Sequence, residues 1–134
     1  MEKKRGIWID RHKAMIVDPE NEHAPYVELH SELNGFEPAK PYRETHRNPE
    51  KKLQAKRDKI LRDYYNNVVN SLDHESDVLI FGPAQAKHEL QKTIDESPKR
   101  FKHISIETGE KMTDNQVVAK VKAYFKKRSQ PRKV

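Results

Sequence analysis

Three aspartates at the ends of predicted elements raise the question of a metal-dependent nuclease, and Asp10 is on the first strand, where such enzymes place a metal ligand. Asp10 ends the β-type run "GIWID", Asp77 opens the run "DVLIF", and Asp114 opens the last helical segment. Hydrolysis of a phosphodiester by paired Mg²⁺ ions needs several carboxylates that converge on the metals. The C-terminal end of the "VLIF" strand, where a second metal ligand is needed, is Phe81-Gly82, which is not acidic. Asp77 lies at the N-terminal end of that strand. We therefore expect no catalytic residue here, with Asp10 at the corner of a hairpin, and we keep a divergent metal-dependent nuclease only as an alternative.

The stretch "DVLIFGPAQAKHEL" predicts a buried strand, a sharp turn and a helix start. Such a turn can present backbone N–H groups to a phosphate. Its sequence matches neither G-x-x-x-x-G-K-[ST] nor G-x-G-x-x-G. Pro83 also removes one of the amides that a phosphate would need. We expect a tight strand-to-helix turn and no cofactor.

The remaining reactive side chains form no recognisable catalytic or metal-binding pattern. The chain has no cysteine, and its seven histidines are dispersed without an H-x-x-x-H or H-x-H pair. No G-x-S-x-G motif marks a nucleophilic serine. We expect no metal site and no enzymatic activity.

The basic residues, in contrast, are unevenly distributed. Residues 1–50 hold 8 basic and 10 acidic side chains, residues 51–73 hold 6 and 3, and residues 74–134 hold 13 and 8, within a net charge of +6. Such a surplus suits a polyanionic partner because Lys and Arg neutralise phosphates and release counterions. An aromatic residue such as Tyr42 can stack on unpaired bases. The residues predicted to contact RNA are Lys40, Tyr42, Arg43, His46, Arg47, Lys51, Lys52, Lys56 and Arg57.

Hydrophobic periodicity predicts the elements that position these residues. Alternating patterns indicate strands, and apolar residues at helical spacing indicate helices. Asn48 is a candidate N-cap and Pro49 a candidate first residue of the long helix, while Thr113 and Gln116 form a capping-box pair. Strands are expected at 6–10, 13–17, 26–30, 78–81 and 103–107, and helices at 48–72, 84–94 and 113–127.

These elements define the expected fold. Three antiparallel strands followed by two parallel strands with helical crossovers give a mixed five-stranded sheet in the order 3-2-1-4-5, flanked by three helices. This is a ribonuclease H-like α/β arrangement. We expect one domain over residues 1–126, a long irregular loop at 31–50 and a basic, disordered tail at 127–134.

Several of these segments resemble a known family. The segments "GIWIDRHKAMIV", "YYNNVVNSL", "VLIFGPAQAKHELQKTI" and "ETGEKMTDNQVVAKVKAYF" occur in the order seen in the middle domain of archaeo-eukaryotic class 1 peptide-chain release factors and Pelota. Small stand-alone relatives of that domain are often labelled translational machinery proteins. In the release factors, the loop before the long helix carries Gly-Gly-Gln and helps to hydrolyse peptidyl-tRNA. The corresponding loop here holds Gly35 alone and no glutamine.

The resemblance implies binding without hydrolysis, as in Pelota, which lacks that motif and acts on stalled ribosomes. We expect a translation-associated protein that binds the ribosome or structured RNA. The alternative is a protein-interaction or self-associating module that uses the basic face or an exposed sheet edge. No apolar run approaches the ~20 residues of a membrane span, and the lack of cysteine fits a reducing compartment. We therefore expect a cytoplasmic protein with no membrane partner.

Overall fold

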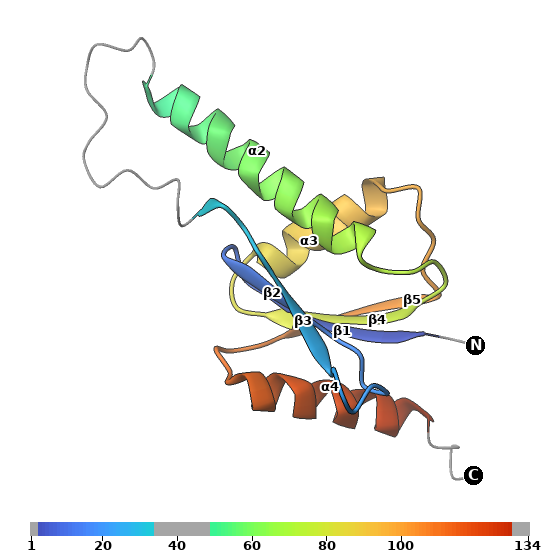
Figure 1. Ribbon diagram of the computed structural model, residues 1–134. Coiled ribbons are helices and arrows are strands. Elements are labelled where there is room, and N and C mark those ends of the chain that lie inside the picture. The colour runs from blue at the N-terminus through green and yellow to red at the C-terminus, as the bar shows by residue number, and fades with distance from the viewer. Residues whose placement is uncertain (1–2, 34–48, 130–134) are drawn as a thin grey trace.

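The computed structural model describes residues 3–33 and 49–129. It has three layers, with helices α2 and α3 on one face of a five-stranded sheet and α4 on the other (Figure 1). The three helices are α2 (Pro49–Asn70), α3 (Ala86–Glu96) and α4 (Asp114–Ser129). None of the helices in the described residues is both long and apolar enough to span a membrane.

The strand order confirms the predicted sheet. The strands are β1 (Lys4–Ile9), β2 (Lys13–Val17), β3 (Tyr26–His30), β4 (Asp77–Gly82) and β5 (His103–Thr108), in the spatial order β3-β2-β1-β4-β5. Strands β1, β2 and β3 pair antiparallel, whereas β4 pairs parallel with both β1 and β5. The protein therefore has the expected mixed α/β fold, with the predicted strand order 3-2-1-4-5 and three flanking helices.

The central strands are buried on both faces of the sheet. Ile7 and Ile9 of β1 point to the side of α2 and α3, whereas Trp8 points to the side of α4. β4 alternates in the same way, with Ile80 on the first side and Phe81 on the second. This burial explains why "DVLIFG" is apolar almost throughout, since a strand covered on both faces has no solvent side.

The helix ends differ from their predicted positions in ways that local geometry explains. α3 begins at Ala86 rather than Ala84, because Ala84 has a φ of 55°, which is incompatible with a right-handed helix. α4 has the predicted capping box, in which Thr113 N–H donates to Gln116 Oε1 (3.0 Å) and Gln116 N–H donates to Thr113 Oγ1 (3.3 Å). α4 ends at Ser129 rather than at the predicted residue 127, so the expected tail at 127–134 begins within this helix, and residues 130–134 lie outside the described part.

A lysine from another segment stabilises the C-terminal end of α2. The last carbonyls of a helix have no partner within the helix and carry the negative end of its dipole. Lys99, in the loop after α3, donates from Nζ to the carbonyl oxygens of Val69 (3.0 Å), Asn70 (3.2 Å) and Leu72 (2.5 Å). One ammonium group therefore satisfies three carbonyls and ties the α3–β5 loop to α2.

We predict that Lys99→Met lowers the free energy of unfolding by about 1–2 kcal/mol, because charge-assisted hydrogen bonds are lost while the apolar stem is kept. Urea denaturation followed by circular dichroism measures this change. Lys92→Met is the matched control, because Lys92 is exposed on α3. Equal unfolding midpoints for the two variants would contradict the capping role.

Candidate nucleic-acid interface on helix α2

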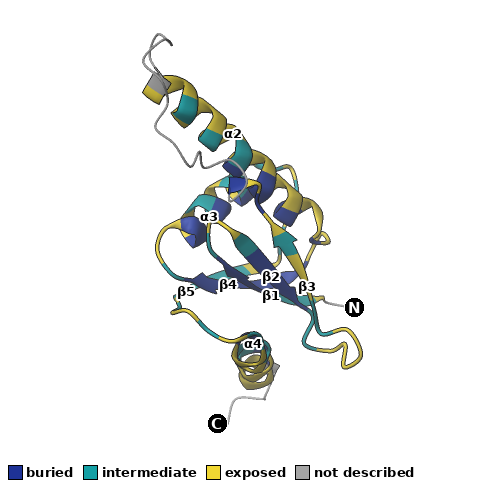
Figure 2. Ribbon diagram, turned by 60° about the vertical axis from the view of Figure 1, so that its left-hand side comes forward, coloured by how far each residue is buried: buried dark blue, intermediate teal, exposed yellow. Residues whose placement is uncertain are grey.

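The two halves of α2 have different surroundings. The second half is packed against the sheet and α3, and its buried side chains are Leu61, Tyr64, Tyr65, Val68 and Val69. In the first half, residues 50–60, every side chain is exposed except Leu53, Arg57 and Ile60, which are half-buried. Figures 1 and 2 show this first half projecting beyond the body of the domain, with mostly exposed residues.

Two tyrosines hold the helix at the point where it leaves the body. Tyr64 donates its hydroxyl hydrogen bond to the carbonyl oxygen of Asp10 (2.9 Å), and Tyr65 donates to Glu89 Oε1 (2.5 Å). Burial raises the pKa of both hydroxyls, so they stay protonated and remain donors. The helix is thus pinned to the β1–β2 hairpin on one side and to α3 on the other.

Glu89 joins three elements at this anchor point. Arg11 of the β1–β2 hairpin donates from Nε (3.2 Å) and Nη2 (2.7 Å) to the two carboxylate oxygens of Glu89 on α3, and Tyr65 of α2 donates to the same carboxylate. Burial alone raises the pKa of Glu89, but the hydrogen bonds from Arg11 and Tyr65 outweigh it and hold the pKa below its ordinary value.

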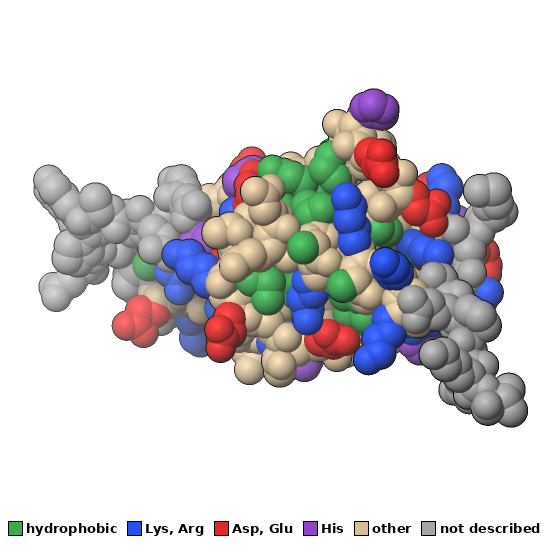
Figure 3. Space-filling view, turned by 90° about the horizontal axis from the view of Figure 1, so that it is seen from below, with side chains coloured by type: hydrophobic (Ala, Val, Ile, Leu, Met, Phe, Trp, Pro, Cys, Tyr) green, Lys and Arg blue, Asp and Glu red, His purple; other side chains and the backbone are tan. Residues whose placement is uncertain are grey.

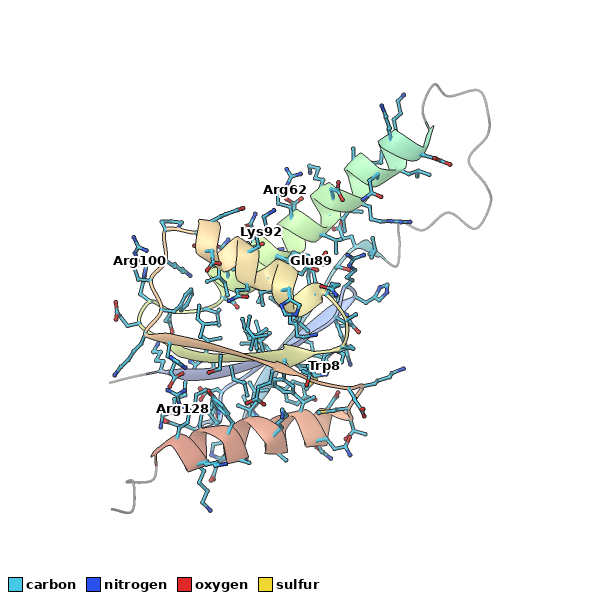
Figure 4. All side chains as sticks on the ribbon, turned by 180° about the vertical axis from the view of Figure 1, so that it is seen from behind. Trp8, Arg62, Glu89, Lys92, Arg100 and Arg128 are labelled. Carbon is cyan, nitrogen blue, oxygen red and sulfur yellow. The ribbon has the colours of Figure 1, made fainter. Side chains whose placement is uncertain are left out.

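The exposed side of α2 carries a continuous row of cations. We define the basic stripe as Lys51, Lys52, Lys56, Lys59 and Arg62, all of which are exposed. At about 100° per residue these five residues fall within an arc of about 140°, and they extend along about 16 Å of the helix axis. Arg62 lies on the outer side of α2, away from the sheet (Figure 4).

Acidic side chains of the described residues neutralise little of this stripe. Lys59 pairs with Asp63 at 3.4 Å, with both side chains well exposed, so the attraction is weak and screened by salt. Asp58 lies outside the stripe and accepts a hydrogen bond from Gln54 (2.8 Å). The projecting half of α2 therefore presents a strongly positive outer surface.

The structure brings together only part of the predicted RNA-binding set. Lys51, Lys52 and Lys56 lie on the stripe, whereas Arg57 is half-buried on the opposite side of the helix. Lys59 and Arg62 were not among the predicted contacts, although helical spacing extends the same face to them. The other predicted residues lie outside the described part of the chain: Lys40, Tyr42, Arg43, His46 and Arg47.

The strand-to-helix turn after β4 is as tight as predicted. Gly82 has a φ of 146°, and a Cβ at this position would overlap the carbonyl oxygen of Ile9. Gly109 N–H donates to the carbonyl oxygen of Gly82 (3.3 Å), which places a second glycine against the same backbone. The two glycines thus have a structural role, because they let three backbone segments meet.

The three aspartates do not converge. Asp10 is the predicted corner residue, since its Oδ1 accepts the N–H groups of His12 (2.7 Å) and Lys13 (2.8 Å). Asp77 lies at the other end of the parallel strands, where it pairs with Arg128 (3.0 Å), and Asp114 accepts from the Tyr26 hydroxyl (3.2 Å). Within residues 3–33 and 49–129, no three acidic or histidine side chains are grouped as a metal site requires.

No family model matches the chain, and no curated protein is significantly similar to it. The basic stripe and its anchor are therefore the features on which a function can be based.

We predict that Glu89→Gln lowers the free energy of unfolding at neutral pH by about 1 kcal/mol. The folded-state pKa of Glu89 is lower than its ordinary value of 4.5, so its carboxylate stabilises the fold above that value. This contribution is lost as the pH falls through the folded-state pKa, and the difference from wild type should shrink below about pH 4. Thermal denaturation at several pH values measures it, with the exposed Glu96→Gln as control. A difference that is the same at acidic and neutral pH would exclude this role.

Proposed function

We propose that this protein is a non-catalytic, translation-associated protein that binds ribosomal or other structured RNA through the basic stripe of α2 and the loop before it. The observation that carries the proposal is the projecting first half of α2, which exposes four cations, Lys51, Lys52, Lys56 and Lys59, with Arg62 continuing the stripe where the packed second half begins. The projecting part of the helix can contact an RNA partner while the body of the domain stays out of contact with that RNA.

The rigidity of the stripe supports binding to a defined arrangement of phosphates. An isolated helix of this length is marginal in water, but here the packed second half supplies the nucleus from which the first half continues. The cations are therefore held at helical spacing before binding, and only their side chains lose freedom on contact. Backbone phosphates are the chemistry that matches such a row.

The basic residues of α4 are engaged differently. Lys120 pairs with Glu107 (3.1 Å) and lies over the ring of Phe81 (5.4 Å from its centroid), and Arg128 pairs with Asp77. Figure 3 shows the face of α4 as a mixture of hydrophobic, basic and polar side chains. Part of the positive charge of α4 is thus paired within the fold, whereas the residues of the basic stripe on α2 are all exposed.

The resemblance to the release-factor middle domain supports the same assignment. In those factors the loop before the long helix enters the ribosome, and the corresponding loop here lacks Gly-Gly-Gln. Binding rather than hydrolysis is the activity that this difference favours. A ribosomal partner implies a cytoplasmic location, and the role of Lys40, Tyr42, Arg43, His46 and Arg47 stays a prediction from the sequence.

We predict that replacing Lys51, Lys52, Lys56 and Lys59 with glutamate weakens binding to a structured ribosomal RNA fragment by at least about 10-fold at roughly 50 mM salt. Loss of phosphate contacts also makes the log–log salt dependence shallower, by roughly 3 units. Fluorescence anisotropy over a salt series measures both quantities, and circular dichroism checks that α2 is intact.

The matched control carries the same charge change on other exposed lysines, with glutamate at Lys92, Lys111, Lys122 and Lys127. This control should bind RNA within about 3-fold of the wild type, because only long-range attraction is altered. Equal losses in the two variants would mean that binding depends on net charge alone, and would contradict a defined interface on α2.

A further inference from the structure

Strand β3 forms one border of the sheet and leaves hydrogen-bonding groups on its outer side. Ser31 N–H donates to His12 O (2.9 Å) and Pro25 O accepts from Asp18 N–H (2.7 Å), so the odd-numbered residues of this segment face β2. In an antiparallel ladder these bonds alternate along the strand. The backbone N–H and C=O groups of Tyr26, Glu28 and His30 therefore point away from β2, and no strand in the described part of the chain pairs with them.

The side chains of β3 do little to block pairing with another strand. Native border strands are usually protected by lysine, proline or a bulge, but Tyr26–His30 contains no lysine or proline and pairs with β2 in unbroken register. Val27 is a large hydrophobic residue, yet 56% of it is exposed, which no other large hydrophobic residue in the described part of the chain matches. Half-buried Leu29 lies beside it on the same face of the sheet. Figure 2 shows β3 at the border of the sheet with exposed and half-buried residues.

We propose that a second copy of this chain is the partner of this border, with the two β3 strands pairing antiparallel about a twofold axis perpendicular to the sheet. Such pairing is self-complementary, because each strand offers the other the same row of donors and acceptors. The two sheets then join into one continuous sheet of ten strands.

Charge selects the register of this pairing. A register centred on Glu28 places two carboxylates directly opposite each other, which is unfavourable. A register centred on Leu29 instead places Glu28 of each copy opposite His30 of the other, so that two such pairs form. Glu28 Oε2 already lies 3.2 Å from His30 Nε2 within one chain, so both side chains are on the face where they would meet.

The same register covers the exposed apolar surface. On the opposite face of the sheet, Leu29 meets Leu29 of the second copy, and Val27 lies diagonally beside it. The pairs between Glu28 and His30 contribute four backbone hydrogen bonds, because each pair exchanges two. The interface is small, so the dimer should be weak and should be populated only at the upper end of a protein concentration series.

Dimerisation also has a consequence for the proposed RNA-binding role. An axis perpendicular to the sheet keeps both α2 helices on the same side, so the dimer presents two basic stripes to one partner and gains from multivalency. This consequence rests on the proposed function, whereas the strand pairing does not. A dimer that binds no RNA would leave the pairing intact and refute only the RNA role.

Analytical ultracentrifugation of nuclease-treated protein over a concentration series tests the pairing. The wild type should change from monomer to dimer as the concentration rises. Glu28→Pro should stay monomeric, because it removes an outward N–H that the monomer does not use, and a border strand tolerates proline at such a position. Val27→Lys should also stay monomeric, through a charge placed in the apolar contact.

Glu28→Thr is the matched control, because it keeps the N–H and a residue suited to strands but removes the charge. It should still dimerise, about 3- to 10-fold more weakly than the wild type. A wild type that is monomeric at all concentrations, or a dimer that Glu28→Pro and Val27→Lys leave unchanged, would overturn the proposal.

Discussion

The arrangement of this protein depends on the packing of the second half of α2 against the sheet. Leu61, Tyr64 and Val68 are buried there, and Tyr64 and Tyr65 add hydrogen bonds to the hairpin and to α3. Because this half is held on two sides, its contacts alone fix the direction of the helix axis. The first half then extends into solvent as a continuation of a stable helix.

The other two helices of the described chain lie against the sheet, whose strands β1 and β4 are buried on both faces. α4 lies along the other face and contributes Val117, Val121 and Phe125 to a second core cluster with Trp8 and Phe81. Its contacts run from its first turns to its last, and its cations at Lys120 and Arg128 are bound by residues of the sheet. α3 is short and lies against the body. Part of the positive charge of α4 is thus paired within the fold, whereas the charged residues of the stripe on α2 are all exposed.

Much of the fold followed from local sequence patterns, because its signals are local. Asp10 at the hairpin corner, the Thr113–Gln116 capping box and the buried "VLIF" strand each depend on neighbouring residues only. The start of α3 was predicted two residues early, because helical spacing does not show that Ala84 has a positive φ, which ends the turn before the helix can begin. β1 begins at Lys4, earlier than predicted, since Lys4 and Arg5 continue the pairing with β4.

The candidate site was predictable only in part, because one of its features is local in the sequence and the other depends on the tertiary fold. Helical spacing alone groups the lysines of α2, but the division of the helix into a buried and a projecting half depends on where the sheet ends. Helical spacing also places Arg57 opposite the stripe, where it is half-buried, and extends the stripe to Arg62. The exposed border at β3 likewise depends on strand order, which decides that Val27 lies at a margin rather than in the centre.

The central claim is that the stripe of α2 serves binding to the ribosome, and co-sedimentation of the purified protein with ribosomes and separated subunits tests it most directly. The experiment is run at about 50 and about 300 mM salt, a range over which non-specific phosphate contacts weaken strongly. The account predicts binding that persists at the higher salt on one subunit or on stalled complexes. Loss of all binding at the higher salt, with no preference between subunits at the lower, would contradict it.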